Sequence, residues 1–388
     1  MRILFITPSF FPRIGGVEKH VYEVSRELIK KKHKIFLLTE EDLGYKFNKN
    51  LIYQTKIISD NEAIKLKYID ISSYITHKFD SDLSVVSFNA GNKGFLKKFR
   101  IWLYFLSNKN FFKQFDIIHC HDVFIWYFPL KFLFIKKPVY ITFHGYETKF
   151  PPSKKAIIIR KISEKLTWGN ICIGDYIRKW YGTKPDYVSY GGVDKFKPKQ
   201  LFPTRRNKFK KQITNGSIFK ILFIGRLEKD TGIPTYLKVM EILKERGIKY
   251  EFFACGDGTL RNEVEKFGKV NGFVNNVFDY INNCDIVFAS SYLSILESLF
   301  AKKIVVSTYD NSLKRDYLLM SPFSKFIICF QNPKRIADKI EFYMFNNQNN
   351  KVINDAYQWA RKQTWEKVAN IYLSLWKNEN NVYMYNFE

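Results

Sequence analysis

Paired cysteines, long apolar runs and a signal sequence are lacking in this chain. Its five cysteines lie far apart, mostly inside apolar runs, and no two form a C-x-x-C pair. This pattern excludes a disulfide scaffold or a zinc site and predicts reduced, buried thiols. No apolar stretch reaches the ~18–20 residues needed to cross a bilayer, and the N-terminal RILFIT has no cleavage site. We therefore expect a cytoplasmic protein, either free or peripherally bound at the inner face of the cell membrane.

Acidic residues are scarce relative to basic ones. The chain has 37 Asp and Glu against 63 Lys and Arg, which gives a net charge of +26. Such an excess attracts polyanions or an anionic membrane surface, although a lysine-rich composition with solvated faces explains it equally well. No nucleic-acid recognition motif accompanies the charge, so no nucleic-acid partner is expected. A basic polyanion-binding protein stays as an alternative function.

Short apolar runs alternate with helical patterns along the whole sequence. RILFIT (residues 2–7) and KIFLLT (residues 34–39) flank a predicted helix at residues 16–31, and similar runs recur. Apolar runs separated by helices indicate a parallel sheet built from βαβ units. Residues 191–216 are rich in Pro, Lys and turn residues and predict a linker, after which KILFIG (residues 220–225) starts a second series.

The predicted fold class is α/β, with two doubly wound, Rossmann-like domains facing one another across a cleft at the carboxyl ends of their strands. The length of 388 residues favours two domains, which we place at residues 1–190 and 191–363. The last helix, at about residues 364–388, is expected to pack back on the first domain. Its predicted apolar face consists of Trp365, Val368, Ala369, Tyr372, Leu373 and Trp376.

Gly15 and Gly16 precede the first predicted helix. Glycine allows a ligand to approach the backbone closely, and the free N–H groups at a helix start are suited to a diphosphate. The pattern is not G-x-G-x-x-G, so a dinucleotide is not indicated. A purely structural turn is the alternative.

Arg226 and Lys229 follow the first apolar run of the second series, in GRLEKDTG. A guanidinium at the carboxyl end of a strand is suited to bind phosphate oxygens bidentately. Ordinary surface charge is the alternative for each residue alone. We expect both residues to contact a phosphate.

Glu297 lies in YLSILESLF, a predicted helix between two buried strands, among large apolar side chains. A carboxylate is rarely placed there unless something compensates for its lost hydration, so a ligand is the simplest partner. We expect Glu297 to accept hydrogen bonds from a ribose diol, and the free N–H groups of Leu293 and Ser294 to face a phosphate. An exposed helix position is the alternative.

His144 ends a buried strand in TFHG, where a neutral imidazole is suited to bond a sugar hydroxyl or a leaving-group oxygen. His119 and His121 point to the same side of a predicted strand, but no further ligands are evident, so no metal site is predicted. The D-S-D segment at residues 80–82 resembles a metal-binding motif of a different transferase architecture. Its polar surroundings predict a loop instead.

The stretch GNKGFLKKFRIWLYFLSNKNFFKQF, residues 91–115, mixes basic and aromatic residues. Basic side chains beside aromatic ones fit a helix that lies in an anionic membrane interface. A core-packed helix with a basic rim is the alternative.

Taken in order, these motifs resemble those of a retaining glycosyltransferase of family 4, which has the GT-B fold. PSFFPRIGGVEKHVYEVSREL resembles its glycine-rich N-terminal motif, TFHG its acceptor-side histidine motif and YGGVD its interdomain crossing. GRLEKDTG resembles its arginine motif and YLSILESLFAKKIVVST its donor-binding glutamate segment. The resemblance runs almost end to end, and several spaced motifs in the right order are more specific than any one alone.

The resemblance implies a function for each of these residues. Gly15 and Gly16 would contact the donor phosphates, Arg226 the diphosphate, Glu297 the ribose and His144 the transferred sugar, which makes His144 and Glu297 the candidate catalytic residues. Such enzymes move a sugar from a nucleotide diphosphate to an acceptor hydroxyl with retained anomeric configuration, usually without an essential metal. The implied donor is a UDP-sugar or GDP-sugar, no cofactor is expected, and the implied acceptor is a cell-surface polysaccharide or a glycolipid.

Two departures from the family's pattern stand out. The family pairs two glutamates, but the position of the first is Ala289 here, and the turn before Glu297 is short. The family's usual lysine after the arginine falls at Thr231, which leaves Lys229 as its substitute. Because both changes remove polar contacts to the donor, a catalytically silent GT-B scaffold that binds a nucleotide sugar or a partner enzyme is the second hypothesis.

Overall fold

The computed structural model describes most of the chain as two compact units. It covers residues 1–11, 13, 15–40, 53–55, 67–69, 83–91, 94, 96–145, 150–194, 218–274, 276–345 and 349–377. The first unit is Met1–Ser189 with the segment that begins at Trp365, and the second is Tyr190–Thr364. Most of the predicted linker, and the predicted loop at residues 80–82, lie outside the described residues.

A nine-stranded sheet forms the centre of the first unit, in the order β3-β4-β5-β2-β1-β6-β7-β8-β9. The strands from β5 to β9 in this order are parallel, whereas β3 and β4 add antiparallel pairing at one edge. The central strands are continuous apolar runs because both of their faces are buried. The strands are β1 (Arg2–Thr7), β2 (Lys34–Glu40), β3 (Tyr53–Thr55), β4 (Lys67–Ile69), β5 (Leu83–Phe88), β6 (Ile117–His121), β7 (Val139–Phe143), β8 (Asn170–Ile173) and β9 (Tyr187–Ser189).

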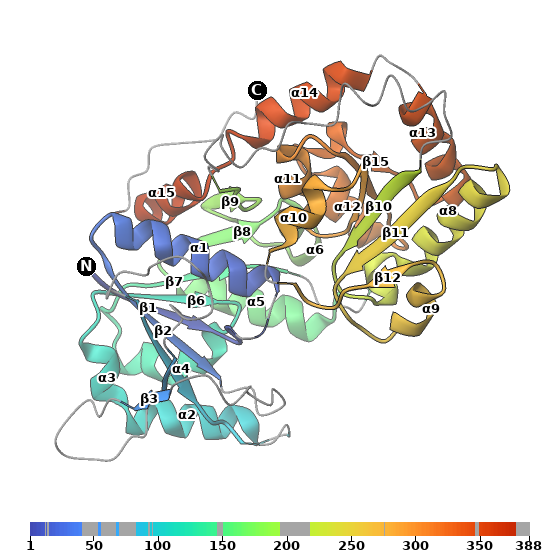
Figure 1. Ribbon diagram of the computed structural model, residues 1–388. Coiled ribbons are helices and arrows are strands. Elements are labelled where there is room, and N and C mark those ends of the chain that lie inside the picture. Colours follow the sequence, from blue (N-terminus) through green and yellow to red (C-terminus); the bar gives the residue numbers. More distant parts are fainter. Residues whose placement is uncertain are drawn as a thin grey trace. The chain divides into compact units, whose positions relative to one another are not determined.

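Helices from both ends of the chain cover this sheet. They are α1 (Gly16–Lys30), α2 (Lys97–Ser107), α3 (Lys109–Lys113), α4 (Phe124–Leu133), α5 (Lys154–Leu166), α6 (Tyr176–Tyr181) and α15 (Trp365–Trp376). The C-terminal helix α15 packs beside α1 (Figure 1). Its buried side includes Leu375, whereas Leu373 is only half-buried, so the predicted apolar face was wrong at that position.

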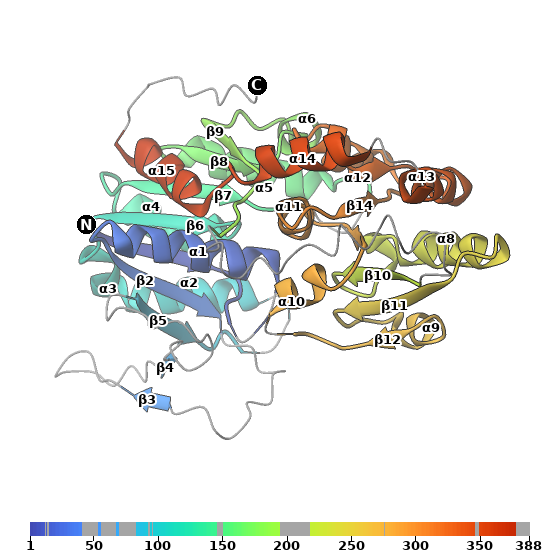
Figure 2. The same ribbon diagram turned by 45° about the horizontal axis from the view of Figure 1, so that its top comes forward.

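The second unit has a six-stranded, fully parallel sheet in the order β12-β11-β10-β13-β14-β15. Its strands are β10 (Phe219–Ile224), β11 (Tyr250–Cys255), β12 (Lys269–Val270), β13 (Ile286–Ala289), β14 (Ile304–Ser307) and β15 (Ile328–Cys329). Its helices are η3 (Lys229–Thr231), α8 (Ile233–Glu245), α9 (Arg261–Glu265), α10 (Val277–Asn282), α11 (Tyr292–Phe300), α12 (Ser312–Leu319), η4 (Ser324–Phe326), α13 (Pro333–Phe345) and α14 (Asn349–Ala360). Helix α13 packs beside α8, and α14 beside α11 (Figure 2).

Both sheets are doubly wound, and this determines where a ligand can bind. The strand order reverses between β1 and β6 in the first unit and between β10 and β13 in the second. In such sheets the ligand crevice lies at the carboxyl ends of the strands, at the point of reversal. The prediction of two Rossmann-like α/β domains is therefore confirmed. Gly15, Arg226 and Glu297 follow strands at these points, and His144 follows β7, the strand next to β6.

The five cysteines are buried free thiols, as predicted. Burial raises the pKa of the Cys255 thiol to about 12, so it stays protonated and unreactive near neutral pH. Among the described helices, none combines the length and apolarity required to span a bilayer.

Candidate active site

Helix α1 begins at the reversal point of the first sheet with the two predicted glycines. Gly15 is the N-cap residue, and the carboxylate of Glu18 folds back over it, where Ser9 Oγ donates to Glu18 Oε1 at 2.5 Å. A Cβ on Gly15 would lie 2.4 Å from Glu18 Oε2, whereas a Cβ on Gly16 would meet nothing within 4 Å. A side chain at position 15 would thus displace the carboxylate end of Glu18, whereas Gly16 leaves open space at the helix start.

Glu18 is a residue that the sequence argument missed. An acidic residue three positions after an N-cap is the ordinary signal for a side chain that folds back on a helix start. Its buried carboxylate interacts favourably with the positive end of the helix dipole. A phosphate at Gly15 would meet that negative charge, so the predicted phosphate contacts of Gly15 and Gly16 stay predictions.

Four of the six histidines of the chain meet in the first unit. His119 and His121 lie on β6, His144 follows β7, His20 lies on α1, and all four are buried. His121 Nδ1 lies 2.7 Å from His144 Nε2, and the rings of His20 and His144 are 4.8 Å apart. The two strand histidines do point to the same side, as predicted, and they bring His144 into a cluster that sequence spacing alone did not reveal.

A chain of hydrogen bonds crosses this cluster from α15 to α1. The indole N–H of Trp376 donates to His119 Nδ1 at 3.0 Å, and His119 Nε2 lies 2.8 Å from Thr142 Oγ1. Thr142 Oγ1 lies 2.9 Å from Tyr372 Oη, which lies 3.0 Å from His20 Nε2. Because an indole N–H can only donate, His119 Nδ1 accepts, and the Nε2–H of the neutral ring donates to Thr142; in the contacts of Tyr372 with Thr142 and His20 either atom can be the donor.

The cluster holds its imidazoles in the neutral form. Burial lowers the pKa of His20, His119 and His121 well below 6.5, and the neighbouring His144 lowers it further. Burial, with the nearby Arg160 guanidinium, lowers the pKa of His144 to about 3. Neutral imidazole is the form that bonds a sugar hydroxyl. Among the described residues, no group of His, Cys, Asp and Glu side chains is arranged to hold a metal ion.

Asp122 is a second missed residue of the first unit. It follows β6 with φ 61°, and its Oδ1 accepts the backbone N–H of His144 at 3.0 Å. Burial raises the pKa of this carboxyl, and Arg160 opposes that shift. Asp122 therefore fixes the backbone of His144 at the carboxyl edge of the sheet.

In the second unit, Arg226 follows β10 at the point where the strand order reverses. Its side chain is 57% exposed, and Nη2 lies 2.7 Å from Asp230 Oδ2. Lys229 is exposed in the same loop. Thr231, at the position of the family's lysine, is buried, and its Oγ1 bonds Arg226 O at 2.7 Å and Glu228 O at 2.8 Å. This hydroxyl shapes the loop that presents Arg226.

Glu297 lies among apolar side chains of α11, but it is only half-buried. It lies on the same side of the helix as Leu293, which is half-buried, and Phe300, which is buried, while Leu296 and Leu299 on the other sides are buried. The helix packs on nearly all sides, so the more open side carries the charge. Glu297 still belongs to the helix that follows β13, the neighbour of β10.

The start of α11 is closed by a tyrosine pair. Only Ser290 and Ser291 separate β13 from α11. The N–H of Tyr292 donates to Tyr317 Oη at 3.0 Å, and the two tyrosine rings stack at 4.1 Å. The N–H group of Tyr292, the first in α11, is therefore already bonded. The phosphate contacts of Leu293 and Ser294, which follow it, stay predictions.

Lys314 is the missed residue of the second unit. It lies on α12, which follows β14, and is only 5% exposed. Its Nζ donates to Ser290 O at 2.7 Å, at the carboxyl end of β13, and lies 4.3 Å from the centre of the Tyr317 ring. Nothing in the family pattern pointed to this residue.

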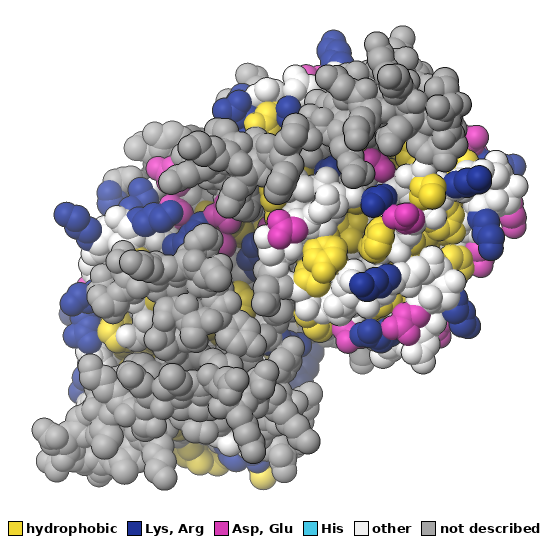
Figure 3. Space-filling model, in the orientation of Figure 1, with side chains coloured by type: hydrophobic (Ala, Val, Ile, Leu, Met, Phe, Trp, Pro, Cys, Tyr) yellow, Lys and Arg dark blue, Asp and Glu magenta, His cyan; other side chains and the backbone are white. Residues whose placement is uncertain are grey.

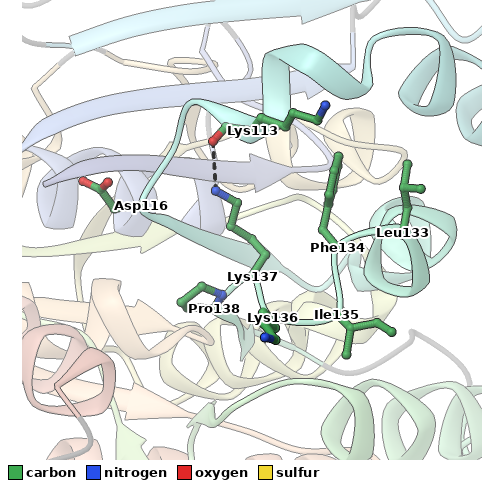
Figure 4. Close-up of a pocket in the computed structure, with 8 residues that line it drawn as sticks. All are labelled: Lys113, Asp116, Leu133, Phe134, Ile135, Lys136, Lys137 and Pro138. Carbon is green, nitrogen blue, oxygen red and sulfur yellow. Dashed lines mark hydrogen bonds between the residues drawn. The ribbon is translucent and has the colours of Figure 1, made fainter.

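A depression of about 600 Å³ lies at the amino ends of β6 and β7, opposite to the carboxyl ends where the predicted site residues lie (Figure 4). Asp116 and Pro138 in its wall precede β6 and β7, and Lys137 Nζ donates to Lys113 O at 3.0 Å. None of the predicted site residues lines it. The candidate site is therefore not this depression.

Two doubly wound sheets, each with polar residues at its point of reversal, are the architecture of a GT-B glycosyltransferase. Residues 14–194 match the family described as "Glycosyltransferase Family 4", and residues 204–359 match "Glycosyl transferases group 1". The chain therefore belongs to the GT-B glycosyltransferases of the family 4 type, and it is a transferase enzyme. A search of curated proteins finds no match.

Solved structures agree on the fold over nearly the whole chain. Sucrose-phosphate synthase from Thermosynechococcus elongatus is 11% identical, with a TM-score of 0.68 over 97% of this chain and 98% of that one. The trehalose-6-phosphate enzyme of E. coli, solved with UDP-2-fluoro glucose, is 12% identical, with a TM-score of 0.63 over 97% and 99%. WaaG, a glycosyltransferase involved in lipopolysaccharide biosynthesis, is 12% identical, with a TM-score of 0.60 over 95% and 99%.

Proposed function

We propose that this protein is a retaining glycosyltransferase that moves a sugar from a UDP-sugar or GDP-sugar to an acceptor hydroxyl. The observation that supports this most directly is the position of Arg226 at the reversal point of the second sheet, with Glu297 on the helix that follows the neighbouring strand. Arg226 would bind the diphosphate and Glu297 the ribose. A solved structure of the same fold holds a UDP-sugar analogue, which is consistent with such a donor.

His144 would bond a hydroxyl of the transferred sugar. A low pKa keeps its imidazole neutral across the physiological range, so it can donate or accept one hydrogen bond without adding charge. In this proposal the leaving diphosphate helps to take the acceptor proton, and Arg226 stabilises the charge that develops on it. No essential metal enters the proposal.

Nucleotide release tests this function. The protein is incubated with a panel of UDP-, GDP- and ADP-sugars, alone and with Arg226→Ala or Glu297→Ala. Each variant loses a charge-assisted hydrogen bond of about 1.5–3 kcal/mol, so release falls at least tenfold. Arg246→Ala is the matched control, because Arg246 also pairs with carboxylates but ends α8 at the opposite edge of the sheet. Undiminished release in both site variants contradicts the assignment.

A catalytically silent scaffold is the second candidate function. The observation in its favour is the short Ser290–Ser291 connection before α11, together with Thr231 in place of the lysine. Such a protein binds a nucleotide sugar without releasing the nucleotide. Calorimetric binding in the absence of turnover, across the whole donor panel, selects this alternative.

The acceptor in our proposal is a glycan or a lipid-linked glycan of the cell envelope, reached at the membrane surface. Helix α2 exposes an apolar stripe, and Trp102 beside it stacks on Phe128 of α4, which contacts the exposed Phe132. We call this face the α2–α4 surface. Its exposed apolar residues are Leu96, Phe99, Leu103, Leu106, Phe132 and Leu133.

Basic residues accompany the α2–α4 surface. From residue 96 to residue 137 the basic residues are Lys97, Lys98, Arg100, Lys109, Lys113, Lys131, Lys136 and Lys137, and the acidic ones are Asp116 and Asp122. An excess of basic residues in the segments that carry these exposed apolar side chains is suited to an anionic bilayer. On the face shown in Figure 3, by contrast, Lys and Arg are interspersed with Asp and Glu over the described residues, as expected for solvated charge.

Vesicle binding tests the membrane proposal. Wild type is expected to bind vesicles with 30% phosphatidylglycerol but not pure phosphatidylcholine, and the double variant Phe99→Ser with Leu103→Ser to bind at least tenfold more weakly. Ile158→Ser is the matched control, because Ile158 is 56% exposed on α5. Unchanged binding of the double variant, or displacement from the vesicles by RNA, contradicts the proposal.

A further inference from the structure

We propose that Lys314 is a second diphosphate-binding cation of the second unit, which takes over from the lysine that is missing from the loop after β10. This inference rests on the proposed function and names a further residue of the same donor site. It is carried by the loop after β10, by the position of Lys314, and by the charges around it.

The loop after β10 cannot supply a second inward-facing cation at the expected position. Thr231 is 7% exposed, and its hydroxyl bonds two carbonyl oxygens of the loop, Arg226 O and Glu228 O. A lysine there would lose both bonds. Lys229 is exposed to solvent on the short helix η3, so it binds a ligand only at the surface of the loop.

Lys314 reaches the same edge of the sheet from a different strand. Asn311 caps α12 by accepting the N–H of Lys314 at 2.8 Å, which fixes the start of the helix. The side chain then extends to Ser290 O, immediately after β13, with 2.7 Å between Nζ and the oxygen. Since β13 pairs with β10, the ammonium lies where the strand order reverses, next to the strand that ends at Arg226.

The charged groups around Lys314 comprise two carboxylates and a second cation. The acidic groups that act on it are Asp230 from the loop after β10 and Asp310 from the loop after β14. Arg226 is a second cation within electrostatic range, and it is paired with Asp230. A diphosphate carries two negative charges or more, so its binding would stabilise two neighbouring cations at once.

Burial makes Lys314 costly in the absence of a ligand. Loss of hydration lowers its pKa from 10.5 to about 8, against the opposing effect of the two aspartates. Between pH 8 and 10.5 the unfolded chain binds more protons than the folded one, so folding stability rises with pH there, and below pH 8 the full cost persists. A lysine kept only for structure would be expected to stabilise the fold instead.

The variant Lys314→Met distinguishes a ligand-binding role of Lys314 from a purely structural one, because methionine has a similar length and no charge. We expect the variant to bind the nucleoside diphosphate at least about tenfold more weakly in calorimetry at pH 7, while its ligand-free melting temperature stays equal or rises. Lys303→Met is the matched control. Lys303 Nζ also donates to backbone carbonyls, at 2.8 Å to Asn282 O and 2.7 Å to Cys284 O, but at the opposite end of β13. This control is expected to keep the wild-type affinity.

Proton uptake gives a second measurement that does not depend on a variant. Binding of UDP or GDP to wild type at pH 8.5, measured in two buffers of different ionisation enthalpy, should take up protons because the diphosphate raises the pKa of Lys314 again. Nucleotide binding without proton uptake, or wild-type affinity in Lys314→Met, overturns this inference alone. If UDP, GDP and ADP all fail to bind wild type, the proposed function fails and this inference fails with it.

Discussion

Acid should lower the folding stability of the first unit because of its buried histidine cluster. The pKa of His144 is about 3 in the folded state, against 6.5 for a free imidazole. Between these values the unfolded chain binds more protons than the folded one, so stability falls as the pH falls from 6.5. At pH 5 this residue alone destabilises the unit by about 2 kcal/mol relative to pH 7.

The other three histidines add to this loss. The pKa values of His20, His119 and His121 are also lowered by burial, so each must shed its proton to fold. We therefore expect the total loss between pH 7 and pH 5 to exceed the contribution of His144 alone. The first unit regains this stability as the pH rises through 6.5.

Amide hydrogen exchange of β6 and β7 at pH 7 and pH 5 measures this effect in the first unit alone. The free energy of opening in wild type should fall by at least about 2 kcal/mol between pH 7 and pH 5. In His144→Gln this fall should be smaller by about 2 kcal/mol. His33→Gln is the comparison, because His33 is half-buried in the turn after α1, outside the cluster; its pKa is also lowered, by burial and by the charges of the N-terminus and Lys31. An identical pH dependence in wild type and His144→Gln would refute the reasoning.

Three further substitutions test the packing around the site. Tyr372→Phe removes the hydroxyl that bonds both Thr142 and His20, so two buried groups lose a partner and the first unit should be destabilised by about 2–4 kcal/mol in urea unfolding. A loss below about 0.5 kcal/mol contradicts the hydrogen-bond chain. Gly15→Ala should displace the carboxylate of α1's first turn and cost about 1 kcal/mol, whereas Gly16→Ala has open space and should be neutral or stabilising. Equal effects at both glycines argue against that contact.

The sequence predicted the two sheets because their strands are long apolar runs with helices between them. Residues 2–7 and 34–39 were expected as strands, and β1 and β2 are found there. The three-residue strands β3 and β4 have too little pattern to be recognised, because β4 pairs with β5 and β3 only with β4, at the edge of the sheet. Local periodicity was therefore sufficient for the core of each sheet and not for its edge.

The site was harder to predict, because its contacts join distant parts of the chain. Arg226 and His144 follow strands and were identified from that position alone. The bond between His20 and Tyr372 joins residues 352 positions apart, and the bond of Lys314 to Ser290 comes from a helix two strands away from Arg226. Such contacts depend on tertiary packing, which no short motif specifies.

The side chain of Glu297 illustrates the opposite error. Its apolar neighbours in sequence predicted burial, but α11 is buried on nearly all sides, and the carboxylate lies on the half-open side. A sequence can show that a helix is apolar without showing which of its sides remains open.

A crystal structure of the protein soaked with UDP or GDP tests the central claim most directly. We predict nucleotide density in the second unit, with a diphosphate oxygen within hydrogen-bond distance of the Arg226 guanidinium and the ribose diol at the Glu297 carboxylate. Density that instead lies in the depression beside Lys113 and Pro138, with Arg226 still paired to Asp230 alone, would contradict the account.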